Sequence, residues 1–517
     1  MRTGNQEAAF KVVIVGGGTA GWMCAAGMSR LLDSRDYAIT LVESDEIATV
    51  GVGEATLPHI KTFNDMLGVD EVAFLRETQG TFKLGIEFRD WGKPGDLYHH
   101  PFGTFGEPWA GVDFQHHWAR AKLAGLDPAS LQAYSYAVTA ARANAFEFPN
   151  EDQKSIRSTY AYAYHFDAGL YAAYLRRWSV ARGVTRVEGM VTDIAQDGET
   201  GQVTAITLKS GQVVVGDLFV DCTGFRSLLL GGLMKAEWED WAKWLPCDRA
   251  LAAPCGRAGD FSPYTRSTAQ EGGWIWRIPL QHRTGNGYVF SSAFMDEERA
   301  RDTLLAQLDA PAQMEPKLLR FAAGRRKDGW RKNVVAMGLA SGFLEPLEST
   351  SIFLIQAAVV DLINLMPTKR TGMDPRLAAE FNRLFEIQYD RVRDFLILHY
   401  RLNQRVGQPL WDHVRTMEIP ASLEEKLALF EGRAGLPDYK YGLFSRDSWL
   451  SVLEGQGLTP RAYDRLAEAM PLDVLGAKLA DLKTRIDSNV AAMSSHADFI
   501  GRYAPGAVEA PRKAAAQ

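Results

Sequence analysis

Apolar and polar positions near the start of the chain follow the pattern of a strand, a turn, a helix and a second strand. Lys11 to Val15 is a short β-branched run, and a glycine-rich turn follows it. The residues from Trp22 to Leu32 have a helical composition, and Tyr37 to Val42 is a second apolar run. Short β-branched runs that alternate with a helical segment are typical of a nucleotide-binding unit with parallel strands.

Further strands are predicted after a long helix. Asp167 is suited to be the N-cap of a helix that extends to Arg182. The short apolar runs that follow are Val184 to Val187, Val191 to Ile194, Val203 to Lys209, Val213 to Val215 and Leu218 to Asp221. A nucleotide unit, a helix, a β-meander and a returning strand, in this order, favour a fold whose central sheet is interrupted and then resumed.

The turn after the first strand is the first candidate binding site. It reads Gly16, Gly17, Gly18, Thr19, Ala20 and Gly21. In a dinucleotide-binding turn Gly16 allows the tight bend, Gly18 lets a pyrophosphate approach the backbone, and Gly21 lets helix and strand pack closely. Glu43, at the end of the second strand, would accept hydrogen bonds from ribose hydroxyls. A purely structural turn is the alternative. The spacing does not separate FAD from NAD, but the later strand and turn, Leu218 to Gly224, favour FAD.

Two other local patterns suit a structural role as well as a functional one. The glycine-rich loop Gly51 to Thr56, which includes Gly53, suits a surface turn as well as a loop that closes over a flavin. In the alternating run Thr81 to Trp91, Lys83 lies opposite an apolar face, so it points either into solvent or into an internal tunnel. Periodicity does not decide between these two directions.

Two tryptophans on one strand face form the most unusual local composition. Trp274 and Trp276 lie in the sequence Trp-Ile-Trp-Arg-Ile-Pro, and alternation places both indoles on the same side. Such a pair makes a rigid apolar wall, although core or interface packing is the alternative.

The loop from Gly342 to Ile352 gathers the densest set of polar candidates. It follows the apolar run Val334 to Leu339 and precedes the mostly apolar run Ile352 to Leu365, which predicts a strand, a tight loop and a helix. The loop sets Glu348 beside hydroxyls and free amides at a helix N-terminus, where anions bind. Without the other motifs, this would be a capping sequence.

Bulk properties are those of an ordinary globular enzyme. Apolar residues make up 46% and charged residues 23%, and the net charge of −6 argues against a nucleic-acid partner. No apolar run reaches the roughly 18 residues of a membrane span. The histidines show no metal-ligand spacing. The four cysteines form no C-x-x-C pair, which favours reduced thiols and a cytoplasmic location; they are Cys24, Cys222, Cys247 and Cys255.

Four motifs in this order resemble the flavin-dependent halogenases of the tryptophan-halogenase family. They are the fingerprint Gly16 to Gly21, the run Thr81 to Ile86 around Lys83, Trp274-x-Trp276-x-Ile278-Pro279, and Leu347 to Thr350. The resemblance spans roughly residues 10 to 500. It implies an α/β fold with α+β character, an FAD-binding two-dinucleotide flavoprotein fold with a mainly helical substrate-binding region.

The resemblance also implies a reaction sequence. Reduced FAD, delivered by a separate flavin reductase, reacts with O2, and a halide bound near the flavin is oxidised to hypohalous acid. This oxidant passes through an internal tunnel to Lys83, which either hydrogen-bonds it or forms a haloamine. Glu348 accepts the ring proton or orients the oxidant. Trp274 and Trp276 keep the substrate away from the flavin.

Further site residues follow from the same resemblance. Thr350 and Ser351 would hold the halide on their amides, Leu339 and Ile352 would line the isoalloxazine, and Val191 would lie by the adenine. Several relatives carry glycine where this chain has Ser351, so the choice between chloride and bromide stays open.

The division of the chain follows the same scheme. The expected parts are residues 1–100, the first part of the FAD-binding module; 101–160, an aromatic insertion that covers the active site; 161–362, the second part of the module; 363–505, the helical substrate-binding region; and 506–517, a flexible tail.

The predicted activity is FAD-dependent halogenation of an electron-rich aromatic ring such as indole. The segment Ser448 to Gly457 lacks the paired tyrosines associated with enzymes that clamp free tryptophan, which favours indole or another aromatic. A flavin reductase is the expected partner because no second nucleotide fingerprint is present, and a homodimer is left open. The alternatives are a single-component flavin monooxygenase and a non-catalytic flavin-binding protein.

Overall fold

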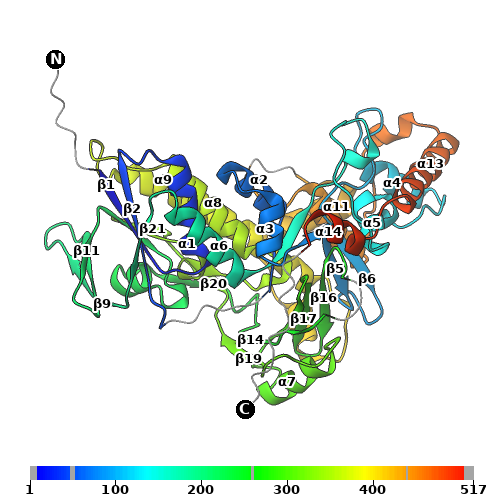
Figure 1. Cartoon of the computed structure of the whole chain (residues 1–517). Helices are drawn as coiled ribbons and strands as arrows, with labels where there is room; N and C mark the ends of the chain where they lie inside the picture. Colours follow the sequence, from blue (N-terminus) through cyan, green and yellow to red (C-terminus); the bar gives the residue numbers. More distant parts are fainter. Residues whose placement is uncertain (1–8, 47–52, 258–260, 438–440, 506–517) are drawn as a thin grey trace, which may run out of the picture.

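The computed structural model describes residues 9–46, 53–257, 261–437 and 441–505. The fold is mixed α/β, as predicted, and Figure 1 shows its strands and helices in chain order. Most of the predicted loop Gly51 to Thr56 is described, but Gly51 and Val52 lie outside the described residues, as does the tail 506–517.

A six-stranded, mainly parallel sheet carries the N-terminal turn. Its strands in spatial order are β21 (Trp330–Arg331), β22 (Val334–Ala336), β12 (Leu218–Asp221), β1 (Phe10–Val15), β2 (Tyr37–Glu43) and β8 (Thr185–Glu188). β1 pairs in parallel with both β12 and β2. The predicted returning strand therefore resumes the sheet beside the first strand, although just over two hundred residues, from Val15 to Leu218, separate the two in sequence.

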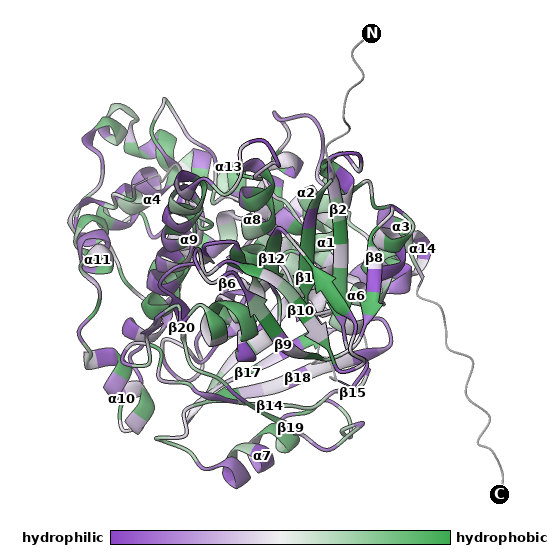
Figure 2. Cartoon of the chain, turned by 90° about the vertical axis from the view of Figure 1, so that its left-hand side faces the viewer, coloured by the Kyte–Doolittle hydropathy of each residue, from purple (hydrophilic) through white to green (hydrophobic). Residues whose placement is uncertain are grey.

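Both faces of β1 are buried, which explains its continuous β-branched run. Val12 and Ile14 belong to the core on the side of α1 (Thr19–Leu31), whereas Val13 and Val15 belong to a second core. The second core is closed by the predicted meander, a separate sheet formed by β9 (Val191–Gln196), β10 (Val203–Leu208) and β11 (Val213–Val215). A parallel strand covered on both sides has no need for polar alternation. Figure 2 shows this layered arrangement.

A second large sheet holds the two tryptophans. Its strands in order are β19 (Lys317–Arg320), β14 (Arg249–Ala252), β18 (Arg283–Phe290), β17 (Gly273–Pro279), β16 (Thr265–Gln270), β5 (Gly85–Arg89) and β6 (Leu97–Pro101). β15 (Cys255–Gly256) pairs with β18 outside this path. The tryptophan strand β17 is thus internal, paired on both edges, and α7 (Glu297–Ala306) lies at the outer end of this sheet in Figure 1.

Two small sheets complete the β structure. One is formed by β3 (Gly53–Ala55), β7 (Ala163–Asp167) and β4 (Thr81–Lys83), and the other by β13 (Trp238–Asp240), β20 (Gly324–Arg326) and β23 (Gly342–Phe343).

The run Thr81 to Trp91, predicted as one strand, is divided between two sheets. β4 pairs with β7 and ends at Lys83, and β5 begins at Gly85 in the large sheet. Between them the amide of Leu84 donates to Pro263 O at 2.7 Å, a contact that belongs to neither strand ladder. Alternation alone could not reveal this change of pairing partner, because every residue from Thr81 to Phe88 is buried, whichever face of the strand it lies on.

Helices surround the sheets. The first part of the chain contributes α2 (His59–Leu67), α3 (Glu71–Glu77), α4 (Phe114–Leu123), α5 (Tyr136–Arg142) and α6 (Ala168–Val180), whose N-cap is Asp167, as predicted. The later helices are α8 (Ser351–Asn364), α9 (Pro375–Arg401), α10 (Pro409–Thr416), α11 (Ala421–Arg433), α12 (Arg446–Gly455), α13 (Leu472–Ala491) and α14 (His496–Tyr503). α13 packs on α4 and α5, so the aromatic insertion and the C-terminal helices form one lobe in Figure 1.

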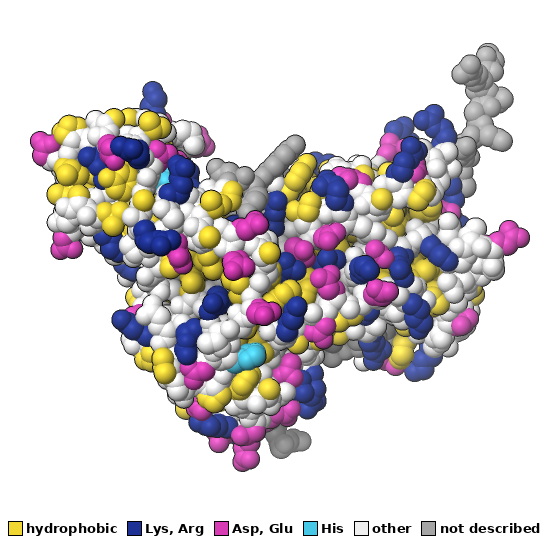
Figure 3. Space-filling model, turned by 180° about the vertical axis from the view of Figure 1, so that it is seen from behind, with side chains coloured by type: hydrophobic (Ala, Val, Ile, Leu, Met, Phe, Trp, Pro, Cys, Tyr) yellow, Lys and Arg dark blue, Asp and Glu magenta, His cyan; other side chains and the backbone are white. Residues whose placement is uncertain are grey.

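The surface bears charges of both signs. On the face shown in Figure 3, lysine and arginine side chains are interspersed with aspartate and glutamate. Within the described ranges, every helix is too short or too polar to cross a membrane.

The C-terminal helix supports the strand that ends at Lys83. Phe82 stacks on Phe146 with ring centroids 4.1 Å apart and also contacts the ring of Phe499 in α14. The amide of Phe82 donates to His496 Nε2 at 3.1 Å, and His496 Nδ1 donates to Phe261 O at 3.1 Å. One buried neutral imidazole thus joins β4 to α14 through both ring nitrogens.

Replacing His496 by leucine is expected to destabilise the fold by about 2–4 kcal/mol, because a buried amide and a buried carbonyl lose their partner. Chemical unfolding followed by circular dichroism measures this difference. His413→Leu is the matched control: His413 is exposed, so its loss should cost less than about 0.5 kcal/mol. Equal stability of the two variants would contradict the role of His496.

The same contact predicts a pH dependence of stability. Burial lowers the pKa of His496 to about 4, so the folded state binds fewer protons than the unfolded state between that pH and the usual histidine range. Stability contributed by His496 is therefore present above about pH 6.5 and is lost as the pH falls toward 4. His496→Leu should show a correspondingly shallower loss of unfolding free energy over this window.

Candidate functional site

The glycine turn leaves a cradle open at the start of α1. A Cβ at Gly16 would lie 2.2 Å from Cys222 O, and one at Gly21 would lie 1.9 Å from Gly16 O, so both positions require glycine for close backbone packing. A Cβ at Gly18 would meet nothing within 4 Å. Gly18 is the N-cap of α1 and no side chain within the described ranges caps the helix, so its first amides are available to a pyrophosphate. Thr19 and Ala20 form the first residues of this helix.

Glu43 lies against the same turn. It ends β2, and its Oε2 accepts from the indole nitrogen of Trp22 at 3.1 Å while Oε1 accepts from Arg186. A Cβ on Gly17 would lie 1.7 Å from Glu43 Oε2, so only glycine admits the carboxylate here. Each carboxylate oxygen has a further acceptor site for a ribose hydroxyl. The turn and Glu43 together fit the pyrophosphate and ribose of FAD.

The other predicted flavin residues lie on elements around this turn. Leu339 is half-buried in a short 3-10 turn, Gly338–Ala340, where a Cβ on Gly338 would lie 2.9 Å from the Cβ of Ala20. Ile352 is buried in the first turn of α8.

Two more predicted flavin residues come from the small sheets. Val191 begins β9 and packs, half-buried, against the second core. Gly53 packs in β3 against Ile278 of β17, where a Cβ would lie 3.4 Å from Ile278 Cγ2. The structure brings Leu339 close to the start of α1, and Gly53 close to the tryptophan strand.

Lys83 is fully buried, and its ammonium donates two hydrogen bonds. Its side chain is 0% exposed, and Nζ donates to Thr56 O at 3.0 Å and to Ser349 Oγ at 2.9 Å. Nζ also lies 5.0 Å from the ring centroid of Phe102. Burial lowers the pKa of Lys83 to about 7, although the nearby Glu348 carboxylate opposes this shift. Of the two directions that periodicity allowed, the side chain takes the inward one.

Glu348 is equally buried and lies between two histidines. Its Oε2 is 2.7 Å from His100 Nδ1, and its Oε1 is 2.7 Å from His399 Nε2, at ion-pair distance but out of line with the imidazole N–H. Burial alone would raise the pKa of Glu348, but the two histidines outweigh it and lower the value to about 2. The carboxylate is therefore ionised at neutral pH.

One unusual backbone conformation points three consecutive side chains in different directions. Ser349 has φ 58° and ψ 35°, a left-handed conformation that is uncommon for a residue with a Cβ. As a result Glu348 faces the histidines, Ser349 faces Lys83, and Thr350 is the N-cap of α8. Strain of this kind is tolerated where the surrounding contacts over-determine the conformation.

The start of α8 fits an anion. The hydroxyl of Thr350 is buried and, among the residues that the structure describes, has no hydrogen-bond partner, and none of their side chains caps the helix. Ser351 is the first residue of the helix, so its amide and the one that follows have no partner within the helix. A buried unpaired hydroxyl beside free amides is suited to hold a halide.

Comparison with known proteins identifies the family. The family model described as tryptophan halogenase matches residues 11–472. The chain belongs to the tryptophan halogenase family. It is 36% identical to the tryptophan 6-halogenase ThaL of Streptomyces albogriseolus over 95% of this chain and 97% of that protein.

Two solved structures are similar over nearly the whole chain. The flavin-dependent halogenase Xcc4156 of Xanthomonas campestris is 42% identical, with a TM-score of 0.92 over 97% of this chain and 99% of that one. BrvH, a flavin-dependent halogenase of Brevundimonas sp. BAL3, is also 42% identical, with a TM-score of 0.92 over 96% of this chain and 99% of that one. The predicted family, fold and enzyme class are confirmed: the protein is a flavin-dependent halogenase that uses reduced FAD and a halide.

Both tryptophans of the pair are buried in the main core of the halogenase. Trp274 is 0% exposed and Trp276 7%, and their ring centroids lie 6.2 Å apart. A second buried carboxyl, Glu345, accepts from Tyr400 Oη at 2.6 Å. Burial raises the pKa of Glu345 to about 7, although Tyr400, Trp274 and Cys247 beside it oppose the rise.

The structure adds site residues of the halogenase that the sequence did not single out. His100 and His399 hold Glu348, and Ser349 bonds Lys83. His100 is 248 positions from Glu348 in sequence, and no spacing links the two. The only signal in the sequence was the adjacent pair His99-His100 in an apolar stretch. Such a pair occurs as often in a packed core as in a functional site.

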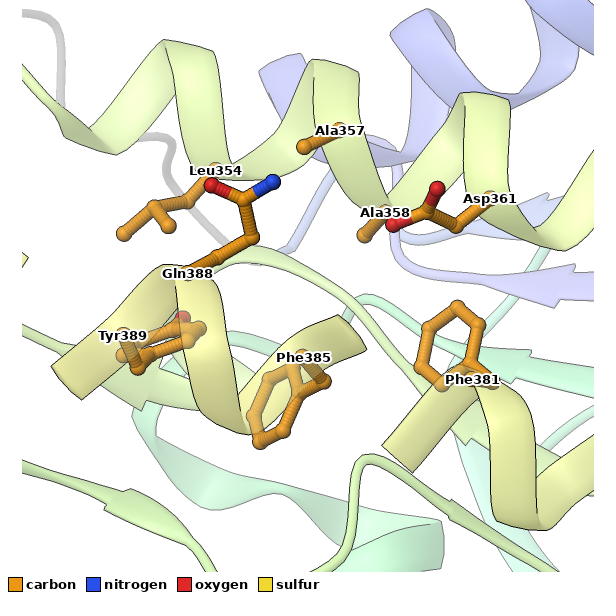
Figure 4. A pocket seen from close by; sticks show the side chains of 8 residues that line it. All are labelled: Leu354, Ala357, Ala358, Asp361, Phe381, Phe385, Gln388 and Tyr389. Carbon is orange, nitrogen blue, oxygen red and sulfur yellow. The ribbon is translucent and has the colours of Figure 1, made fainter. Parts of the chain in front are cut away.

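A hollow between α8 and α9 lies outside this constellation. Figure 4 shows its lining side chains, Leu354, Ala357, Ala358, Asp361, Phe381, Phe385, Gln388 and Tyr389. None of the predicted site residues is among them. In the described part of the chain, no group of three or more histidine, cysteine, aspartate or glutamate side chains is arranged to hold a metal ion.

Replacing Gly18 by valine should remove FAD binding without harming the fold. The added side chain would project into the open cradle, where the pyrophosphate would lie, so FAD affinity should fall at least about tenfold. Calorimetric titration with FAD measures this. Gly198→Val is the control, because Gly198 also meets nothing within 4 Å but lies on the surface. Unchanged FAD affinity in Gly18→Val would place the pyrophosphate elsewhere.

Proposed function

We propose that this halogenase transfers an oxidised halogen to an electron-rich aromatic ring such as indole, at a site formed by Lys83 and Glu348. The observation that carries the proposal is the bond from Lys83 Nζ to Ser349 Oγ, which links a buried amine to the residue between Glu348 and Thr350. Amine, carboxylate and candidate halide site are thus joined through three consecutive residues.

The halide is held at the start of α8, on the amides near Thr350 and Ser351. When bound at the glycine turn, reduced FAD together with O2 supplies the oxidising equivalents that convert the halide into hypohalous acid. Leu339 and Ile352 would line the flavin ring, Val191 would lie near the adenine, and Trp274 and Trp276 would separate flavin from substrate.

Lys83 delivers the halogen to the ring. In its ammonium form it donates a hydrogen bond to hypohalous acid, which makes the halogen more electrophilic. As the free amine, it forms a haloamine and water. A pKa of about 7 provides both forms near neutral pH. In either route the net reaction is the same: the aromatic C–H and hypohalous acid give a carbon–halogen bond and water.

Glu348 stabilises the cationic ring and accepts its proton. A carboxylate that stays ionised down to a pKa of about 2 is a weak base, but a halogenated ring cation is a far stronger acid than any side chain. The anion also offsets the charge that Lys83 carries when protonated.

The substrate is proposed to be indole or a larger aromatic rather than free tryptophan, the substrate that ThaL's name gives. An amino-acid anchor needs charged groups that face the site. In α12, Asp447 instead accepts from the amide of Phe105 at 2.9 Å, and Trp449 packs edge-on against Phe395, with ring centroids 5.0 Å apart. These contacts use the segment for packing, which supports a substrate without a zwitterion.

The remaining proposals rest on the sequence and on the four cysteine side chains. A separate flavin reductase is proposed as the source of reduced FAD, and a homodimer stays open. The four cysteines are buried free thiols, which supports a cytoplasmic location. The proposed parts are the FAD module in residues 1–100 and 161–362, the covering insertion 101–160, the substrate region 363–505 and the tail 506–517.

Lys83→Met should abolish ring halogenation while hypohalous acid is still made. Supplied with indole, NaBr, FAD, NADH and a generic reductase, the wild type should form bromoindole, and Lys83→Met at least about a hundredfold less. Chromatography quantifies the product. Lys61→Met, a lysine on the surface helix α2 paired with Asp65, is the matched control. Equal bromoindole from Lys83→Met, or oxygenated product without bromide, would refute the proposed role.

Glu348→Gln keeps the shape of the side chain and removes its charge. Turnover should fall on the order of a hundredfold because the ring proton loses its acceptor, while FAD affinity is kept. Glu345→Gln, in the same loop, should cost less, since a carboxyl whose pKa is raised to about 7 carries less charge at neutral pH. Steady-state rates of the two variants decide this; unchanged turnover in Glu348→Gln removes Glu348 from the mechanism.

A further inference from the structure

His399 has a partner on each ring nitrogen. Nε2 faces Glu348 Oε1 at 2.7 Å, and Nδ1 lies 3.0 Å from Tyr98 Oη. All three side chains are buried, at 1% exposure or less. Burial lowers the pKa of His399, so the ring is neutral at neutral pH and only one of its nitrogens carries a proton. The position of this proton determines whether His399 presents an N–H donor or a lone pair to Glu348.

A chain of hydrogen bonds fixes the answer, and it begins at the backbone of His399 itself. The carbonyl of His399 can only accept, and it lies 3.0 Å from Gln456 Nε2, which fixes the orientation of that amide. The same Nε2 donates to Tyr98 Oη at 3.1 Å. Tyr98 Oη, already an acceptor, then has its own proton free to donate to His399 Nδ1. Nδ1 is therefore an acceptor, and the proton lies on Nε2.

The contact with Glu348 requires the same assignment. At 2.7 Å an unprotonated Nε2 would set its lone pair against the carboxylate, so the short contact between His399 Nε2 and Glu348 Oε1 favours a proton on Nε2, although the N–H is not aligned with the oxygen. A charged ring would instead need Nδ1 to donate to Tyr98, which would leave the buried phenol proton without an acceptor. Both ends of the network thus select the neutral ring with its proton on Nε2.

We propose that Tyr98 and Gln456 are positioning residues that act through His399, locking its tautomer so that Glu348 is always held by a donor. This inference rests on the proposed role of Glu348. Tyr98 lies two positions before His100 on β6, so the same strand also supplies the second histidine that holds the carboxylate. The lock keeps Glu348 ionised and aimed in one direction while the ring is halogenated.

The charged and titratable groups that face Glu348 come from three elements. They are Lys83 from β4, His100 from β6 and His399 from α9, and Tyr98 reaches it through His399. Removing the Tyr98 hydroxyl leaves all three in place. Without this hydroxyl, the proton of His399 can move from Nε2 to Nδ1. Nε2 then presents a lone pair to Glu348 in place of an N–H donor. Glu348 then holds its proton more tightly.

The test compares Tyr98→Phe and Gln456→Met with the wild type. Tyr98→Phe should lower the turnover number about tenfold or more with little change in KM for indole. The acid limb of its rate–pH profile should move up by about one unit, because a weaker donor raises the pKa of Glu348. Gln456→Met should shift the limb in the same direction but less, since Tyr98 keeps its hydroxyl.

Tyr171→Phe is the matched control. Tyr171 is also fully buried, and its hydroxyl makes one hydrogen bond, to Asn64 Oδ1 at 2.9 Å, outside this network. A general loss of stability would affect Tyr171→Phe and Tyr98→Phe alike, whereas only the second should move the acid limb. Trapping of hypohalous acid by an added halogen acceptor should be equal in all variants. A profile of Tyr98→Phe that coincides with that of Tyr171→Phe overturns the proposal.

A readout without turnover separates this inference from the proposed function. Nitrogen-15 spectra of histidine-labelled protein, assigned with His399→Asn, report which ring nitrogen carries the proton. The wild type should show His399 protonated on Nε2, and Tyr98→Phe a mixture or a reversal. If His399 is protonated on Nδ1 in the wild type, the lock does not exist. If the tautomers behave as expected but indole is not halogenated, the proposed function fails instead.

Discussion

The dehydration of one ammonium group constrains the rest of the site. Bringing Lys83 out of water costs several kcal/mol unless hydrogen-bond acceptors and negative charge nearby offset the loss. A backbone carbonyl, the Ser349 hydroxyl and the Glu348 carboxylate do so, and each is held in turn by a neighbour. The surroundings must be rigid, because a displaced partner would leave a buried charge unpaired. The same desolvation lowers the pKa of Lys83 to about 7, so both its charged and its neutral form are accessible near neutral pH.

Rigidity around Lys83 is supplied by segments that are distant in sequence. β4 is tied to the C-terminal helix by His496, and the two histidines at Glu348 come from β6 and from the end of α9. α9 also bonds the loop a second time, since Tyr400 donates to Glu345. Strand β6 and helix α9 therefore hold the Glu348 carboxylate, which the six-stranded sheet alone could not do.

Features encoded locally were predictable from sequence. The glycine turn, the end of β2 at Glu43, the returning strand β12 and the start of α8 each depend on a few neighbouring residues, and they lie where the pattern indicated. The break between β4 and β5 was not predictable, because a buried run gives no sign of which sheet it joins. Nor were His100 and His399, since their contacts with Glu348 close long loops and leave no periodic trace in the sequence.

The left-handed turn at Ser349 has a consequence for how such an enzyme can diversify. Because a single pair of backbone torsions aims the acid, the amine's partner and the anion hole in three directions, these functions are geometrically inseparable. A change that relaxes the turn to alter one of them rotates all three. A substitution meant to change halide or ring preference therefore has to leave the backbone turn at Ser349 intact.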